Sequence, residues 1–102
     1  MASQRWTLDG QRALVTGASA GIGLAICREL LGLGAQVLMV ARDAELLEQA
    51  RAELEDDFPG PEDAVLALPA DVTDEEQRSE ILEWAAEQGG LHLLVNNAGG
   101  NI

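Results

Sequence analysis

Apolar residues follow two different spacings along this chain, and the two spacings alternate. Short continuous apolar runs predict buried parallel β-strands, because a strand that is covered on both faces lacks a polar side. Longer stretches in which apolar residues recur at three- and four-residue steps predict amphipathic helices. The predicted strands cover residues 12–16, 36–41, 64–68 and 91–96, and the predicted helices cover residues 21–33, 43–56 and a stretch from about 73 to 88.

Local signals mark the ends of the predicted helices. Gly34 is typical of a left-handed cap after the first helix, and Asp43 is expected to be the N-cap of the second. Thr73 and Glu76 match a capping box for the third helix. The residues predicted to face inward are Leu46, Leu47, Ala50 and Leu54 in the second helix and Ile81, Leu82 and Ala85 in the third.

The regular alternation of strand and helix predicts an α/β fold, a Rossmann-type doubly wound parallel sheet. The crossovers between the strands are expected to be right-handed, and the expected strand order is 3-2-1-4. The first two helices are expected on one face of this sheet and the third helix on the other. The order reverses between strands one and four, which is where such folds bind ligands, outside the carboxyl ends of the strands. Four strands and three helices form an incomplete version of this fold.

Three glycines lie between the end of the first predicted strand and the first turn of the first predicted helix. They are Gly17, Gly21 and Gly23, in the spacing Gly-x-x-x-Gly-x-Gly. Glycine lets the backbone approach a ligand closely, and the free N–H groups of a helix N-terminus attract an anion such as a pyrophosphate. The alternative is an ordinary strand-to-helix turn that is rich in glycine, because a glycine cluster alone is not specific.

Three motifs together resemble the short-chain dehydrogenase/reductase family. They are Thr16 with the glycine pattern, Asp71-Val72 after the third strand and Asn96-Asn97-Ala98-Gly99 after the fourth, in the order that the family has them. The resemblance extends from about residue 8 to residue 102. The opening Arg5-Trp6-x-Leu-x-Gly in addition resembles the tropinone-reductase-like branch.

The resemblance implies a binding site for a nicotinamide dinucleotide. Asp71 resembles the residue that accepts a hydrogen bond from the adenine amino group, although it is also placed as an ordinary acid before a capping box. The asparagines of the Asn96-Asn97-Ala98-Gly99 motif have two possible roles, which are to line the cofactor ribose and to tie the central strands together. The implied cofactor-binding residues are Gly17, Ser19, Ala20, Gly21, Ile22, Gly23, Arg42, Asp71, Val72, Asn97, Ala98 and Gly99.

The end of the second strand bears on the choice between NADP and NAD. Asp43 lies twenty residues after Gly23, where dinucleotide folds often carry an acid that binds the ribose. The resemblance instead implies that NAD-dependent relatives carry this acid at the end of the second strand, where this sequence has Ala41. The next residue, Arg42, stands where NADP-dependent relatives carry a basic residue, and a guanidinium can pair with a 2′-phosphate. We expect NADP as the cofactor, with NAD as the alternative. The alternative interpretation of Arg42 is a solvated surface arginine with no role in binding. Many such relatives also carry a basic residue at the position of Ala20.

The family's catalytic pair is Tyr-x-x-x-Lys, in which the tyrosine is the general acid and the lysine lowers its pKa. The sequence has neither tyrosine nor lysine. Residues 1–102 are therefore interpreted as the cofactor-binding half of an NADP(H)-dependent ketone or alcohol oxidoreductase, without its catalytic half and without a catalytic residue of its own. The alternatives are a nucleotide-binding or inert fragment and, less favoured because Ala41-Arg42 lacks the required acid, an S-adenosylmethionine-dependent methyltransferase.

Charge and cysteine content exclude some partners. The net charge is −12, and residues 42–90 carry three arginines against sixteen acids, which argues against binding to nucleic acid. No apolar run is long enough to span a bilayer, no metal site is expected, and one cysteine cannot form an internal disulfide, so a cytoplasmic location is predicted. The small carbonyl or alcohol substrate would bind only in the full-length parent.

The fourth strand predicts association. Residues 91–96 are almost all apolar, and they would lie at an open sheet edge, which natural proteins usually cover. We expect this chain to pair with a copy of itself or with the missing half.

Overall fold

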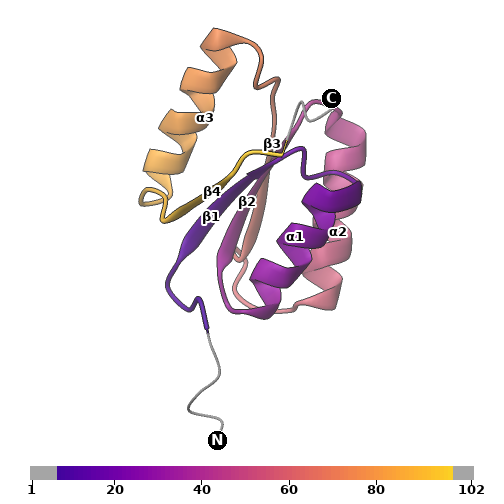
Figure 1. Cartoon of the computed structure of the whole chain (residues 1–102). Coiled ribbons are helices and arrows are strands. Elements are labelled where there is room, and N and C mark those ends of the chain that lie inside the picture. The colour runs from indigo at the N-terminus through magenta and orange to yellow at the C-terminus, as the bar shows by residue number, and fades with distance from the viewer. Residues whose placement is uncertain (1–6, 98–102) are drawn as a thin grey trace, which may run out of the picture.

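The computed structural model describes residues 7–97 of the chain. Strands and helices alternate strictly along these residues, as Figure 1 shows. The elements are β1 (Arg12–Thr16), α1 (Gly21–Gly32), β2 (Gln36–Ala41), α2 (Ala44–Asp57), β3 (Val65–Pro69), α3 (Glu75–Glu87) and β4 (Leu93–Val95).

The four strands form one parallel sheet in the order β3-β2-β1-β4, which confirms the predicted topology. β1 and β2 are central and almost entirely buried, with Leu14 paired to Leu38 and Val15 to Met39. This burial explains why the two strands have continuous apolar sequences. The order reverses between β1 and β4, and the carboxyl ends of both strands lie beside the start of α1.

Helices cover both faces of the sheet (Figure 1). On one face α1 and α2 pack against the sheet, and their core includes Cys27 from α1 and Leu54 from α2. Burial raises the pKa of the Cys27 thiol to about 12, so this side chain is a neutral part of the core. On the other face α3 contributes Ile81 and Ala85. The predicted distribution of the three helices is confirmed.

Two residues predicted to face inward are exposed. Leu46 is 48% exposed and Leu82 is 62% exposed, whereas Leu47 and Ile81 beside them are buried. Neighbouring residues in a helix point about 100° apart, so one of each adjacent pair faces the sheet directly. The prediction was wrong because it gave both members of each pair to the inner face.

The first turn of α3 also differs from the prediction. Asp74 is its N-cap and accepts a hydrogen bond from the backbone N–H of Gln77, so the proposed capping box of Thr73 and Glu76 is absent. Thr73 does not cap the helix because its N–H and hydroxyl both donate to Asp71. The predicted N-cap of α2 is confirmed, since the Asp43 carboxylate accepts from Leu46 N at 3.0 Å.

β4 is shorter than predicted, with three residues instead of six. At its end the Thr16 hydroxyl accepts the N–H of Asn97 at 2.8 Å. This side-chain bond ties the chain after β4 to the end of β1.

Candidate cofactor site

The glycine loop joins β1 to α1 through backbone conformations that favour glycine. Gly17 has a φ of +63° and Gly21 a φ of +59°, which residues with a Cβ adopt at a cost in strain. Among the described residues α1 has no side-chain N-cap and no acid in its first turn. The N–H groups there are left for another acceptor, so the helix start is suited to an anion.

Gly23 has a different role, because it allows close packing. A Cβ on Gly23 would overlap the carbonyl oxygen of Gly17 and would lie 2.9 Å from Asn97 Nδ2. The first turn of α1 therefore packs directly on the glycine loop and on Asn97, the second residue after β4. A larger residue would displace the loop from the helix.

The asparagines after β4 connect it to β1. Thr16, which is 5% exposed, donates to Asn96 Oδ1 at 3.2 Å and accepts from the Asn97 N–H. The Asn97 side chain donates to the Gly17 carbonyl at 3.4 Å. Both asparagines thus take part in tying the end of β4 to β1 at the base of the glycine loop.

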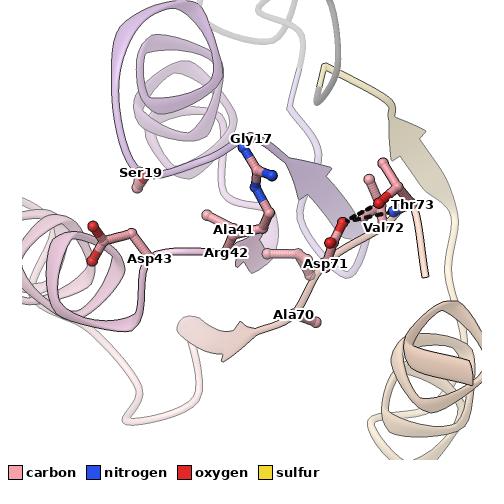
Figure 2. Close-up of a pocket in the computed structure, with 10 residues that line it drawn as sticks. Gly17, Ser19, Ala41, Arg42, Asp43, Ala70, Asp71, Val72 and Thr73 are labelled. Carbon is pink, nitrogen blue, oxygen red and sulfur yellow. Dashed lines mark hydrogen bonds between the residues drawn. The ribbon is translucent and has the colours of Figure 1, made fainter.

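Arg42 follows the last residue of β2 and is exposed. Figure 2 shows its side chain between Ser19 on one side and Asp71 on the other. Ala41 stands at the end of the strand, and Asp43 is turned to the helix that it caps. The guanidinium is therefore the charged group that β2 presents to this site.

Asp71 is held in place by its own chain. Its Oδ1 accepts from the Thr73 hydroxyl at 2.6 Å and from the Thr73 N–H at 2.9 Å. These two hydrogen bonds, with a further contribution from the positive charge of Arg42, lower the pKa of the Asp71 carboxyl, and desolvation opposes them. The group is therefore a carboxylate at neutral pH, and its second oxygen, which accepts no hydrogen bond from residues 7–97, is available to a ligand.

The start of the glycine loop, Arg42 and Asp71 meet in one pocket at the carboxyl ends of β1, β2 and β3, shown in Figure 2. Its volume is about 430 Å³. The lining residues are Gly17, Ser19, Val40, Ala41, Arg42, Asp43, Ala70, Asp71, Val72 and Thr73.

The structure brings together most of the residues that the sequence proposed. Five of them line the pocket, and Gly21, Ile22 and Gly23 form the first turn of α1, after Ala20 at its N-cap position. Asn97 contacts the glycine loop from β4, whereas Ala98 and Gly99 lie outside the described residues. The predicted members of the pocket lining are Gly17, Ser19, Arg42, Asp71 and Val72.

Two contributors to the site were missed. Thr73 fixes the Asp71 carboxylate, and Gln77 accepts the Asp71 N–H at 2.7 Å. The Asp-x-Thr spacing is a signal for such a local turn and was available in the sequence, but it was assigned to the cap of α3. The contact of Gln77 depends on where α3 begins, which the sequence placed one residue too early.

The chemistry of the pocket suits a nucleotide that carries phosphates. A helix N-terminus and an arginine attract anions, and the carboxylate of Asp71 accepts a hydrogen bond. No group of acidic, histidine or cysteine residues that could hold a metal occurs in residues 7–97. In the same span no helix is long and apolar enough to cross a membrane. A site of this kind, at the carboxyl ends of the strands of a doubly wound sheet, is suited to binding a nucleotide.

The family model for the short chain dehydrogenase matches residues 11–102. The chain therefore belongs to the short-chain dehydrogenase family, whose members are oxidoreductases that bind a nicotinamide dinucleotide. This confirms the resemblance that the three sequence motifs carried.

Individual relatives are similar over nearly the whole chain. A tropinone reductase homolog of Arabidopsis thaliana, described as chloroplastic, is 43% identical over 101 residues, which cover 97% of this chain and 30% of that protein. The structure of the Pseudomonas aeruginosa RhlG/NADP active-site complex has a TM-score of 0.81 and 38% identity, over 92% of this chain and 36% of that one. L-Sorbose reductase of Gluconobacter frateurii, complexed with NADPH and L-sorbose, has a TM-score of 0.84 and 36% identity, over 91% and 35%. The chain thus spans about a third of the length of these relatives.

Proposed function

We propose that residues 1–102 are the NADP(H)-binding half of an oxidoreductase that interconverts a ketone and an alcohol. The observation that carries the proposal is the position of Arg42, which follows β2 and shares a pocket with the glycine loop and Asp71. The residue before it is Ala41, so no carboxylate stands there to repel a 2′-phosphate. Two similar solved structures contain NADP or NADPH, which supports this choice, and NAD is the alternative.

The residues of the chain would bind the cofactor in three parts. The glycine loop and the N-terminus of α1 would hold the pyrophosphate, and the guanidinium of Arg42 would pair with the 2′-phosphate and stack on the adenine. Asp71 and Val72 would meet the edge of the adenine. Asn97, with Ala98 and Gly99, would line the ribose on the side of β4.

When bound, the nicotinamide supplies the hydride, and this chain positions it. The proton donor of the reaction would lie elsewhere, because the sequence contains no tyrosine and no lysine. The chain covers about a third of its relatives, so the substrate and the catalytic pair are assigned to the rest of a longer parent protein.

A second candidate is a module that binds a nucleotide, or nothing, and performs no chemistry. The absence of tyrosine and lysine favours it for the chain taken alone. A methyltransferase that uses S-adenosylmethionine is disfavoured, since the ribose diol of that cofactor requires an acid where Ala41 and Arg42 stand.

Calorimetric titration of the chain with NADP⁺, NAD⁺ and S-adenosylmethionine tests these possibilities. We expect binding of both dinucleotides with NADP⁺ tighter, no binding of S-adenosylmethionine, and no turnover of NADPH with a panel of ketones. Tighter binding of NAD⁺ would contradict the role of Arg42. Turnover above a protein-free control would contradict the division into two halves.

We also propose a cytoplasmic location. The described part of the chain has one cysteine, buried and free, which suits a reducing compartment. One relative is described as chloroplastic, so a plastid is the alternative, and fractionation of cells with an antibody to the protein distinguishes the two.

A further inference from the structure

The segment between β3 and α3 is held by side chains from α3 that the proposed cofactor would not touch. Gln77 Oε1 accepts the N–H of Asp71 at 2.7 Å, and Arg78 Nη1 donates to the carbonyl oxygen of Val72 at 2.8 Å. Gln77 is itself placed by the N-cap Asp74, which accepts the Gln77 N–H. Two consecutive residues of one helix thus hold the two residues proposed to meet the adenine.

The hydrogen bonds of this segment leave free a donor on Val72 and an acceptor on Asp71. Thr73 occupies Oδ1 of Asp71, and Asp74 N–H bonds to the Asp71 carbonyl. Within residues 7–97, Asp71 Oδ2 accepts no hydrogen bond and the Val72 N–H donates none. An adenine edge presents an amino donor next to a ring nitrogen acceptor, which matches this pair.

The free Val72 N–H belongs to a peptide plane whose two neighbours are both fixed by α3. Gln77 fixes the plane that precedes Asp71, and Arg78 fixes the plane that follows Val72. Rotation of the middle plane would turn its N–H away from the adenine. The bond from the Asp74 N–H to the Asp71 carbonyl opposes that rotation directly, and the two clamped neighbours add to this restraint. A preorganised donor binds its ligand with less loss of entropy.

We infer that Gln77 and Arg78 are positioning residues that give the cofactor site its preference for adenine over other bases. This inference rests on the proposed function, because it takes the bound molecule to be an adenine dinucleotide. Neither side chain lines the proposed cofactor pocket, so their effect passes through Asp71 and Val72.

The test compares NADP⁺ with its hypoxanthine analogue, in which the adenine amino group is replaced by a carbonyl oxygen. The unsubstituted chain should prefer NADP⁺ about tenfold, the value of a hydrogen bond to a carboxylate. Gln77→Ala and Arg78→Ala should each reduce this ratio to about threefold or less, mainly by weakening the binding of NADP⁺. Arg78→Lys, which retains a donor for the Val72 carbonyl, and Gln77→Glu, which retains an acceptor, should recover much of the preference.

Matched substitutions control for the loss of each side-chain type. Gln88→Ala removes a glutamine at the far end of α3, and Arg51→Ala removes an arginine whose partners are Glu48 and Glu55 on α2. Both should leave the ratio unchanged, and thermal melting identifies any variant that is unfolded. The conservative variants keep the test valid if an alanine variant does not fold.

The outcomes separate this inference from the function beneath it. If the unsubstituted chain binds neither nucleotide, the proposed function is wrong and the inference fails with it. If the chain binds NADP⁺ but all variants keep its base preference, the inference alone is overturned. A loss of affinity that is equal for both nucleotides would mean a merely structural role and would also overturn it.

Discussion

Arg42 is the residue on which the proposed choice of cofactor depends. In a full-length protein carrying this chain, Arg42→Ala should weaken NADP binding by about 1.5–3 kcal/mol, because one charge-assisted phosphate contact is lost. NAD lacks the phosphate, so its binding should change little. Titration of both cofactors measures the difference. Equal losses for NADP and NAD would show that the guanidinium does not contact the 2′-phosphate.

Glycine is required in the loop for two different physical reasons, lack of space for a side chain and a positive φ. Gly23 and Gly21 allow the two reasons to be tested separately. A Cβ on Gly23 meets the Gly17 carbonyl, whereas one on Gly21 has no atom within 4 Å but a φ of +59°. Gly23→Ala should therefore displace the loop and abolish measurable binding of the dinucleotide. Gly21→Ala should cost about 1–2 kcal/mol of stability from backbone strain alone. Similar melting temperatures and affinities for the two variants would contradict this distinction.

Asp71 gives the stability a dependence on pH. The pKa of Asp71 is lower in the folded chain than in the unfolded one. The contribution of its carboxylate to the free energy of unfolding is therefore fully present above the unfolded pKa, about 3.9, and is lost as the pH falls through the folded value. Asp71→Asn removes that contribution. The difference in urea midpoint between the original chain and the variant should therefore be larger at pH 6 than at pH 3, and a difference independent of pH would contradict it.

At the scale of elements, α2 shows how closely packing selects one side chain over its neighbour. Leu47 is 1% exposed and Leu46 is 48% exposed, although both were predicted to face the sheet. Leu47→Ala should reduce the free energy of unfolding by about 2–5 kcal/mol, as for other buried leucines. Leu46→Ala, the matched control, should change it by less than about 1 kcal/mol. Denaturant unfolding of the two variants measures both values.

The order of the elements and most of their bounds could be predicted because apolar spacing and glycine positions are local in the sequence. β2 begins and ends at the predicted residues, Gln36 and Ala41. The length of β4 could not be predicted, because only three residues of the apolar run 91–96 pair with β1, a strand that is distant in the sequence. The contact of Gln77 with Asp71 was missed for a related reason, since it requires the actual start of α3.

The site shows the same division between local and distant information. Each predicted strand of the site is followed by one of its residues, namely Gly17, Arg42 or Asp71. A parallel sheet therefore brings these residues together at the carboxyl ends of its strands. What the sequence could not supply is the packing of Gly23 against Gly17 and the arrangement of α3 behind Val72. These depend on the distances between elements, which apolar patterns do not encode.

At the scale of the whole molecule, the face formed by β4 and α3 remains exposed. Leu94 is 63% exposed and Leu82 is 62% exposed, and the two line a groove of about 440 Å³ between the helix and the sheet. Within residues 7–97, β4 pairs with β1 and with no other strand, so its second edge has unpaired N–H and C=O groups. Natural proteins usually cover such edges and such apolar surface.

We therefore expect the isolated chain to associate with a second copy through the edge of β4. Sedimentation at micromolar concentration should give a species larger than 10.8 kDa, the mass of one chain. Leu94→Lys should shift it toward the monomer, because burying the added charge at the edge is unfavourable. Leu46→Lys, an equivalent change at an exposed leucine of α2, should leave the association unchanged. A clean 10.8 kDa species for the unsubstituted chain would contradict self-association and would mean that this face tolerates exposure to water. The rest of a longer parent would then be the remaining partner that could cover the face.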